Sequence, residues 1–227
     1  MDVARQEAER SAKEGTVIVA EEQTIGRGRF GKRWVSNPGD SLSLSILLYP
    51  TRWVCSRLSI AAPVAVLRAI KLSTGLSPRL KWPNDVLLSG KKACGILVET
   101  SFQEQEVRYA IVGIGINVNR NPSEDPGAGF LATSLATELG RPLPREALLQ
   151  AVLEEMGAIY TTLTDCSRLW GDWRSSLETL GKAVQVRWGD HVEQGVAEDV
   201  DENGNLLLRR PDGTVITLNA GEVTFQT

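Results

Sequence analysis

The residues best suited to chemistry in this chain are gathered in the segment Gly26-Arg27-Gly28-Arg29-Phe30-Gly31-Lys32-Arg33-Trp34. Glycines give a loop backbone angles that other residues avoid, and they leave backbone N–H groups open to a ligand. Arginine guanidinium groups match the oxygens of carboxylates and phosphates. Tryptophan adds a flat face for stacking. This composition favours a loop that holds a small anion with a ring attached; the alternative is a basic surface loop.

The same segment fits G-x-G-x-x-G, a pattern of dinucleotide-binding loops, but its surroundings do not. That pattern is expected to open a helix and to be followed by an acid about 20 residues later. Lys32-Arg33-Trp34-Val35 is not a helix start, and Asp40 comes too early to be that acid. The P-loop pattern G-x-x-x-x-G-K-S/T does not occur. The sequence therefore argues against a nicotinamide enzyme and against a Walker-type phosphate site.

A second cluster is Lys81-Trp82-Pro83-Asn84-Asp85, in which a proline fixes a turn after a predicted strand. The turn sets an amide beside a carboxylate. Asn84 could orient a phosphate or a metal-bound water. Asp85 could bind a hydroxyl or Mg²⁺, or accept a proton from an amine. The alternative is an ordinary turn with a surface lysine.

Two further candidates lie next to glycines on predicted strands. Lys92 stands just ahead of Gly95 and an apolar run, where it can project a fixed positive charge into a cleft. Asn117 ends the run Gly113-Ile114-Gly115-Ile116-Asn117, and its amide offers the donor and acceptor that an adenine edge requires. Each residue also has a purely structural alternative. Lys92 fits a solvent-exposed lysine at the edge of a sheet, and Asn117 fits the polar end of a core strand.

Together these clusters offer cations for two anions, an Asn-Asp turn and no side chain poised as a nucleophile. Such a set suits joining a carboxylate to the α-phosphate of ATP. That reaction needs neutralised charge and in-line positioning more than covalent help from the protein.

Composition narrows the class of protein. The chain has 227 residues, is 42% hydrophobic and carries a net charge of −3, with a pI near 5.4; this argues against a general nucleic-acid binder. Three scattered cysteines indicate neither disulfides nor a metal site, and His191 is the only histidine. No apolar run approaches the roughly 20 residues of a membrane span, and the first residues lack a signal-peptide core. We therefore expect a cytoplasmic protein.

Periodicity predicts an α+β chain in two domains, residues 1–178 and 179–227. Helices are expected over 2–14, 57–73, 131–139 and 144–163 and around Trp170 and Trp173. Strands are expected over 16–20, 41–48, 79–82, 86–88, 95–100, 107–117, 183–187, 195–200, 205–210 and 215–218. The short strands after residue 181 suggest a small antiparallel barrel.

The ordered motifs GRGRFGKRW, KWPNDV, KKACGILVE and GIGINVN closely resemble those of the biotin–protein ligases, also called biotin–acetyl-CoA-carboxylase ligases. The resemblance covers nearly the whole chain. It implies a mixed-sheet catalytic domain of the class II synthetase/biotin ligase type, followed by an SH3-like β-barrel. It also implies two steps: biotin and MgATP give biotinyl-5′-AMP and pyrophosphate, and the biotin then passes to a lysine of a biotin carboxyl carrier protein.

The resemblance assigns roles to residues of this chain. Catalytic roles fall to Arg29, Lys92 and Asp85. Biotin binding falls to Gln23, Gly26, Arg27, Gly28, Arg29, Lys92 and Gly95. ATP binding falls to Lys32, Trp34, Lys81, Asn84 and Asn117. Magnesium is expected to arrive with ATP and to lie near Asn84 and Asp85, without a fixed protein site.

One departure from the family is the absence of its usual Ser-Thr-Asn motif before the first helix, where this sequence has Met1-Asp2-Val3. Three explanations are open: a start codon placed too late, a shortened chain, or weaker biotin binding. The departure bears on full activity and not on the fold. We expect a monofunctional enzyme without a DNA-binding domain, with a carrier protein as partner, no nucleic acid and no membrane, and with homodimerisation allowed. The alternatives are a lipoate or other acyl-protein ligase of related fold, and a biotinyl-AMP-binding module with weak turnover.

Overall fold

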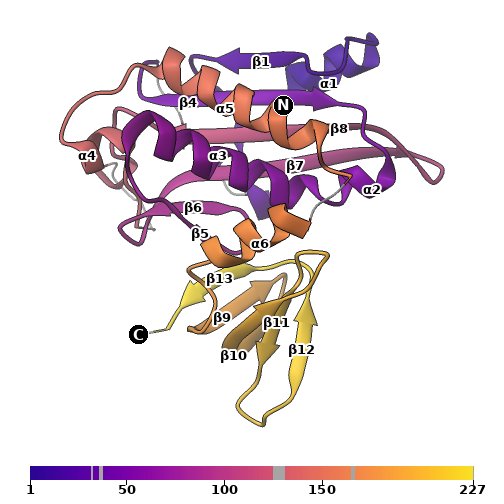
Figure 1. Cartoon of the computed structure of the whole chain (residues 1–227), viewed down its shortest axis with the longest axis vertical. Coiled ribbons are helices and arrows are strands. Elements are labelled where there is room, and N and C mark those ends of the chain that lie inside the picture. Colours follow the sequence, from indigo (N-terminus) through magenta and orange to yellow (C-terminus); the bar gives the residue numbers. More distant parts are fainter. Residues whose placement is uncertain (32, 36–37, 125–130, 165–166, 227) are drawn as a thin grey trace.

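The computed structural model (Figure 1) describes residues 1–31, 33–35, 38–124, 131–164 and 167–226. A six-stranded sheet in the order β1-β4-β8-β7-β6-β5 forms the larger part of the chain, and a five-stranded sheet in the order β12-β11-β10-β9-β13 forms the C-terminal part. The helices lie mostly against the larger sheet. The predicted α+β class is confirmed.

The bounds of the elements follow in chain order. The helices are α1 (Asp2–Glu9), α2 (Arg52–Cys55), α3 (Leu58–Thr74), α4 (Leu135–Leu139), α5 (Arg145–Thr161) and α6 (Ser167–Ser176), with 3₁₀ turns η1 (Arg29–Gly31) and η2 (Pro122–Glu124). The strands of the larger sheet are β1 (Val17–Ala20), β4 (Ser41–Leu48), β5 (Arg79–Lys81), β6 (Asp85–Leu88), β7 (Lys91–Gln103) and β8 (Glu106–Asn117). The small ribbon contains β2 (Gly26–Arg27) and β3 (Arg33–Trp34). The C-terminal strands are β9 (Ala183–Trp188), β10 (His191–Val200), β11 (Leu206–Arg209), β12 (Val215–Leu218) and β13 (Glu222–Phe225).

Alternation along β4 gives the larger sheet two different faces. Leu42, Leu44, Ile46 and Leu48 join the main hydrophobic core, against which α3 and α5 pack. Successive side chains of a strand point to opposite faces. Ser41, Ser43 and Ser45 therefore belong to the other face, which α1 covers near Leu47. This second face carries the predicted site.

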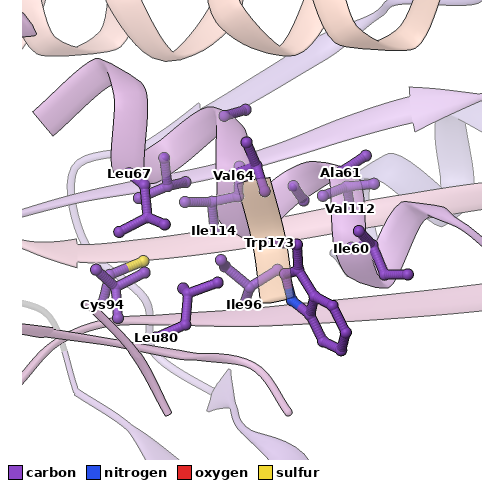
Figure 2. Close-up of a cluster of buried hydrophobic side chains, with 14 of the residues drawn as sticks. Ile60, Ala61, Val64, Leu67, Leu80, Cys94, Ile96, Val112, Ile114 and Trp173 are labelled. Carbon is purple, nitrogen blue, oxygen red and sulfur yellow. The ribbon is translucent and has the colours of Figure 1, made fainter. Parts of the chain in front are cut away.

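Helix α3 is apolar on nearly every side because it lies between the sheet and two other helices. It contacts β6 and β7 as well as α5 and α6. Pro63 lies inside the helix, and Gly75 ends it with a φ of 75°, the left-handed conformation that glycine adopts most easily. Figure 2 shows Trp173 of α6 in this core with Ile60 and Ile96.

Trp82 joins the two sheets. It is 1% exposed, and its peptide bond to Pro83 is cis. The Trp82 backbone N–H donates to Thr179 Oγ1 at 2.9 Å, and its indole Nε1 donates to the Gly204 carbonyl at 2.9 Å. The turn that carries Asn84 and Asp85 is thereby bonded to the segment before β9 and to the turn between β10 and β11.

Several predicted details differ from the structure. The expected helix over 2–14 ends at Glu9, because the following residues bond to β4 and its end: Gly15 N–H donates to Leu47 and Tyr49 Oη donates to Ala12. The expected helix over 131–139 begins only at Leu135, because Leu131 and Thr133 bond to the backbone of Lys92 instead.

The sheets also differ in two respects from the expected mixed sheet and barrel. Every ladder in the described residues is antiparallel, and the parallel pairings among them are two isolated bridges, Leu80–Leu177 and Lys92–Ala132. Strands β12 and β13 lie at opposite ends of the five-stranded order, so a closed barrel is not confirmed. Sequence periodicity did not indicate α2 or β13.

Substituting Trp82 and Trp173 by Phe tests how far the Trp82 hydrogen bond stabilises the fold. Both indoles are buried, but Trp82 Nε1 has an acceptor, whereas Trp173 Nε1 has none in the described residues. Trp82→Phe should therefore lower the free energy of unfolding by about 1 kcal/mol more than Trp173→Phe. Urea denaturation measures both values, and equal losses would contradict this account.

Candidate active site

Four predicted residues meet beside the turn between β5 and β6, and we call Arg29, Asn84, Asp85 and Lys92 the polar cluster. Lys92 Nζ lies 2.6 Å from Asp85 Oδ1. Arg29 donates to Asn84 Oδ1 at 3.2 Å, and Asn84 Nδ2 donates to the Ile96 carbonyl at 2.8 Å. The cluster thus joins two cations to an amide and a carboxylate.

A β-bulge places Lys92 in this cluster. Asp85 pairs with Gly95 and Val86 with Cys94, but Leu87 then pairs with Lys92, so Ala93 has no partner on β6. In a regular ladder Lys92 would share the face of Cys94, which is in the core. One extra residue moves the side chains that follow to the opposite face. The bulge therefore sets the Lys92 ammonium on the same face as Asp85.

Arg29 also contacts the C-terminal sheet. Its guanidinium donates to the Gly221 carbonyl at 3.4 Å. Burial lowers the pKa of Arg29, while the carboxylates of Asp85 and Glu222 oppose that shift by favouring the charged form. Residues from two distant parts of the sequence, at 84–85 and at 221–222, thus position this one cation.

Glycines form the floor beside the polar cluster, on the face that we call the glycine face. Asp85, Gly95, Gly115 and Ser43 stand in register across β6, β7, β8 and β4. A Cβ at Gly115 would lie 2.6 Å from the ring of Trp34, which is closer than packed atoms approach. Glycine is required there because the indole lies directly on the strand.

Neighbouring glycines also receive side chains. A Cβ at Gly95 would lie 3.3 Å from both Lys92 Nζ and the Trp34 ring, and a Cβ at Gly113 would lie 2.8 Å from Met1 Sδ. The absence of side chains thus makes room for one aromatic ring, one ammonium group and one thioether on the same face.

The glycine-arginine segment is a short ribbon in which Gly26 pairs with Trp34. A Cβ at Gly26 would lie 2.0 Å from the Trp34 carbonyl oxygen. Arg27 makes ion pairs with Asp2 at 2.6 Å and Glu99 at 3.7 Å. The sequence indicated no role for either acid: Asp2 lies outside the motifs, and nothing about Glu99, the last residue of KKACGILVE, identifies its partner.

The other predicted residues are less closely grouped. Asn117 is 5% exposed, and its Nδ2 donates to the carbonyls of Thr133 at 3.0 Å and Lys92 at 3.4 Å. Both amide hydrogens are thus used within the protein, so of the expected donor and acceptor for an adenine edge only the acceptor, Oδ1, is left. Lys81 Nζ lies 5.5 Å from the centre of the Phe225 ring. Gln23 and Gly28 are half-buried in the segments flanking β2. Lys32 lies outside the described residues, so its predicted role stays a prediction.

The donor set of the cluster does not suit a fixed metal ion. Within the described part of the chain, no group of three or more His, Cys, Asp and Glu side chains could hold one. Asp85 is paired with Lys92, and Asn84 accepts from Arg29. A hard cation such as Mg²⁺ would need most of its oxygen ligands from a bound phosphate.

An open pocket of about 320 Å³ lies elsewhere, between α1 and the ends of β4 and β8. Its charged side chains, Arg108 and Glu9, pair with each other. None of the predicted site residues that the structure describes lines this pocket. No helix in the described ranges has the length and apolar character to cross a bilayer.

Two protein-family models match the sequence of this chain. The model of the biotin/lipoate A/B protein ligase family matches residues 3–117, and that of the biotin protein ligase C terminal domain matches residues 179–225. The chain belongs to the biotin/lipoate A/B protein ligase family.

Individual members of this family align over most of the chain. The biotin–[acetyl-CoA-carboxylase] ligase of Paracoccus denitrificans is 33% identical, covering 92% of this chain and 89% of that protein. The bifunctional ligase/repressor BirA of Bacillus subtilis is 35% identical over 92% of this chain, which spans only 66% of that relative's length. The structure of biotin protein ligase from Aquifex aeolicus in complex with biotin and ATP superposes with a TM-score of 0.81 at 29% identity, covering 98% of this chain and 94% of that chain.

Replacing Gly115 by Ala tests the packing of the glycine face in this family member. The new methyl group would meet the Trp34 ring, so we expect Trp34 to move and the protein to lose about 1–3 kcal/mol of stability. Gly113→Ala is the matched control, because the flexible Met1 side chain can move away. Fluorine NMR on fluorotryptophan-labelled protein, with the Trp34 signal assigned by Trp34→Phe, should show a shift in Gly115→Ala only. An unshifted Trp34 signal in that variant would contradict the packing described.

Proposed function

We propose that this chain is a biotin–protein ligase that forms biotinyl-5′-AMP from biotin and MgATP and transfers biotin to a lysine of a biotin carboxyl carrier protein. The polar cluster on the glycine face is the observation that carries the proposal: two cations and one carboxylate meet there, beside an aromatic ring. The names of the relatives, with biotin and ATP bound together in the Aquifex aeolicus protein, support the choice of substrates.

In the first step a carboxylate oxygen of biotin attacks the α-phosphorus of ATP. A P–O bond forms, the bond between the α-phosphorus and the bridging oxygen to the β-phosphate breaks, and pyrophosphate leaves. Both reactants are anions, so the barrier falls when fixed cations stand near the reacting oxygens. Lys92 and Arg29 are those cations, and Asp85 and Asn84 hold them on the glycine face.

Lys92 must exchange partners to take this role. In the structure its ammonium pairs with Asp85, and both side chains are partly exposed, at 27% and 20%. A carboxylate or phosphate entering between them offers Lys92 a new anion. Asp85 is then released from its ion pair as the adenylate forms.

In the second step the amine of a carrier lysine attacks the acyl carbon of the adenylate, and AMP leaves. The amine must lose a proton to form the amide. We assign Asp85 to orient that amine and accept its proton, since its carboxylate lies beside Lys92 at the reacting end of the cluster.

Magnesium would supply charge neutralisation on the ATP phosphates. Asn84 and Asp85 would be the side chains that help to hold such an ion, and most of its ligands would come from the triphosphate. Biotin would lie along Gln23, Gly26, Arg27, Gly28 and Gly95, and the nucleotide along Trp34, Lys81 and Asn117. We further propose that residues 1–178 form the catalytic domain and 179–227 the C-terminal domain, and that the reaction takes place in the cytoplasm.

Alanine substitutions test the two cations. Lys92→Ala and Arg29→Ala should each lower biotin-dependent pyrophosphate release by about 100-fold, the scale seen when one transition-state donor is lost. Lys91→Ala is the matched control, because the Lys91 side chain is exposed and precedes the bulge. A loss of pyrophosphate release under about threefold in Lys92→Ala and Arg29→Ala would show that these two cations do not neutralise the reacting anions.

Asp85→Asn tests whether Asp85 acts as a proton acceptor in the transfer step rather than in adenylate formation. The amide keeps the shape of the side chain but cannot accept a proton, so transfer from preformed adenylate to the carrier should slow more than adenylate formation does. Single-turnover measurements separate the two rates, and raising the pH should restore part of the transfer rate because more carrier lysine is already deprotonated. Equal losses in both steps would remove Asp85 from the proton-transfer role.

Lipoate is the competing substrate, because the matching family includes lipoate ligases. Thermal unfolding with biotin, lipoate or neither compares the two acids on the same protein. We expect biotin to raise the melting temperature and lipoate to leave it unchanged. A larger rise with lipoate than with biotin would favour the alternative function.

A further inference from the structure

Three buried polar atoms on the glycine face have no hydrogen-bond partner within the described part of the chain. They are Ser41 Oγ, Ser43 Oγ and Trp34 Nε1. Ser41 and Ser43 are only 4% and 3% exposed. A buried polar group without a partner destabilises a protein, and native proteins leave few of them. Three such atoms on one face point to a partner that binds there.

The strand register places these atoms together. Ser43 is opposite Gly115, and Ser41 is opposite Asn117, on neighbouring strands β4 and β8. Trp34 Nε1 lies 3.0 Å from the position that a Cβ of Gly115 would occupy. The two hydroxyls and the indole N–H therefore surround one patch of the glycine face, across Gly115 from Gly95 and Asp85 of the polar cluster.

Small size alone does not explain the serines. Alanine would fill nearly the same volume without burying an unpaired hydroxyl. The alternating leucines of β4 pack into the core, so only the residues between them can face the glycine side. Serines at positions 41 and 43 would offer two hydroxyl groups for hydrogen bonds to a ligand with several oxygen atoms.

We propose that Ser41 and Ser43 hydrogen-bond directly to the nucleotide part of the acyl-adenylate, an inference that rests on the proposed function. An indole N–H only donates, so the ligand atom beside Trp34 must be an acceptor, and a serine hydroxyl can donate to or accept from a ribose or phosphate oxygen. Ser41 stands opposite Asn117, to which we assign the adenine edge. The acid's carboxylate belongs to Lys92, on the other side of Gly115.

Alanine variants with two ligands test the proposal. A non-hydrolysable acyl-sulfamate analogue of biotinyl-AMP represents the adenylate, and biotin alone represents the acid. Ser41→Ala and Ser43→Ala should each weaken calorimetrically measured binding of the analogue by about 3- to 10-fold, the loss expected for one hydrogen bond. Binding of biotin alone should stay within about twofold.

Stability of the ligand-free protein provides a second readout. Removing an unpaired buried hydroxyl removes its desolvation penalty, so both variants should melt at the same temperature as the parent chain or higher. Ser176→Ala is the matched control, because Ser176 Oγ donates to the Asp172 carbonyl at 2.7 Å on α6. It should lower the melting temperature and leave binding of the analogue unchanged.

Three results would overturn the proposal. Unchanged affinity for the analogue would mean that the hydroxyls do not touch it, and an equal loss for biotin alone would place them at the acid. A fall in melting temperature like that of Ser176→Ala would show that the hydroxyls are already bonded in the free protein. If the parent chain binds neither ligand, the proposed function itself fails; if it binds both and the variants match it, only this inference fails.

Discussion

The β-bulge between β6 and β7 is the constraint on which the site depends. It leaves Ala93 unpaired and brings Lys92 onto the face of Asp85, where the two charged groups lie 2.6 Å apart. A ladder without the bulge would direct the ammonium toward the core. Arg29, from the glycine-arginine segment, would then be the one cation of the polar cluster left next to the turn at Asn84. One irregular position in an otherwise regular sheet thus determines whether the two anions of the proposed reaction can be brought together.

The C-terminal sheet supports this arrangement from the other side. Trp82 is bonded to Thr179 and Gly204, and Arg29 donates to the Gly221 carbonyl. The turn and one of the two cations are therefore held by residues more than 90 positions away in the sequence. Removing the C-terminal strands would remove hydrogen bonds from the site as well as from the core. The two sheets form one structural unit around the polar cluster, which gives a physical reason for their occurrence in one chain.

The sequence predicted the α+β class and most elements because hydrophobic periodicity is a local signal: the strand over 41–48 has the same bounds in the structure. It also singled out Arg29, Asn84, Asp85 and Lys92 as candidates from their motifs, and the structure brings these four residues together. It did not indicate the bulge, because pairing register depends on two strands at once. It likewise missed Gly221, Asp2 and Glu99, which act through distant contacts. It predicted a strand over 41–48 and gave no role to Ser41 or Ser43. Hydroxyls without partners become visible only once the burial of every neighbour is known.

Biotin-dependent exchange of labelled pyrophosphate into ATP tests the central claim most directly, because exchange requires reversible formation of an acyl-adenylate and needs no carrier protein. The account predicts exchange when biotin and MgATP are both present, none without biotin, and little with lipoate in its place. Absence of exchange in a folded protein that also fails to bind biotin would contradict the assignment of the polar cluster to adenylate formation.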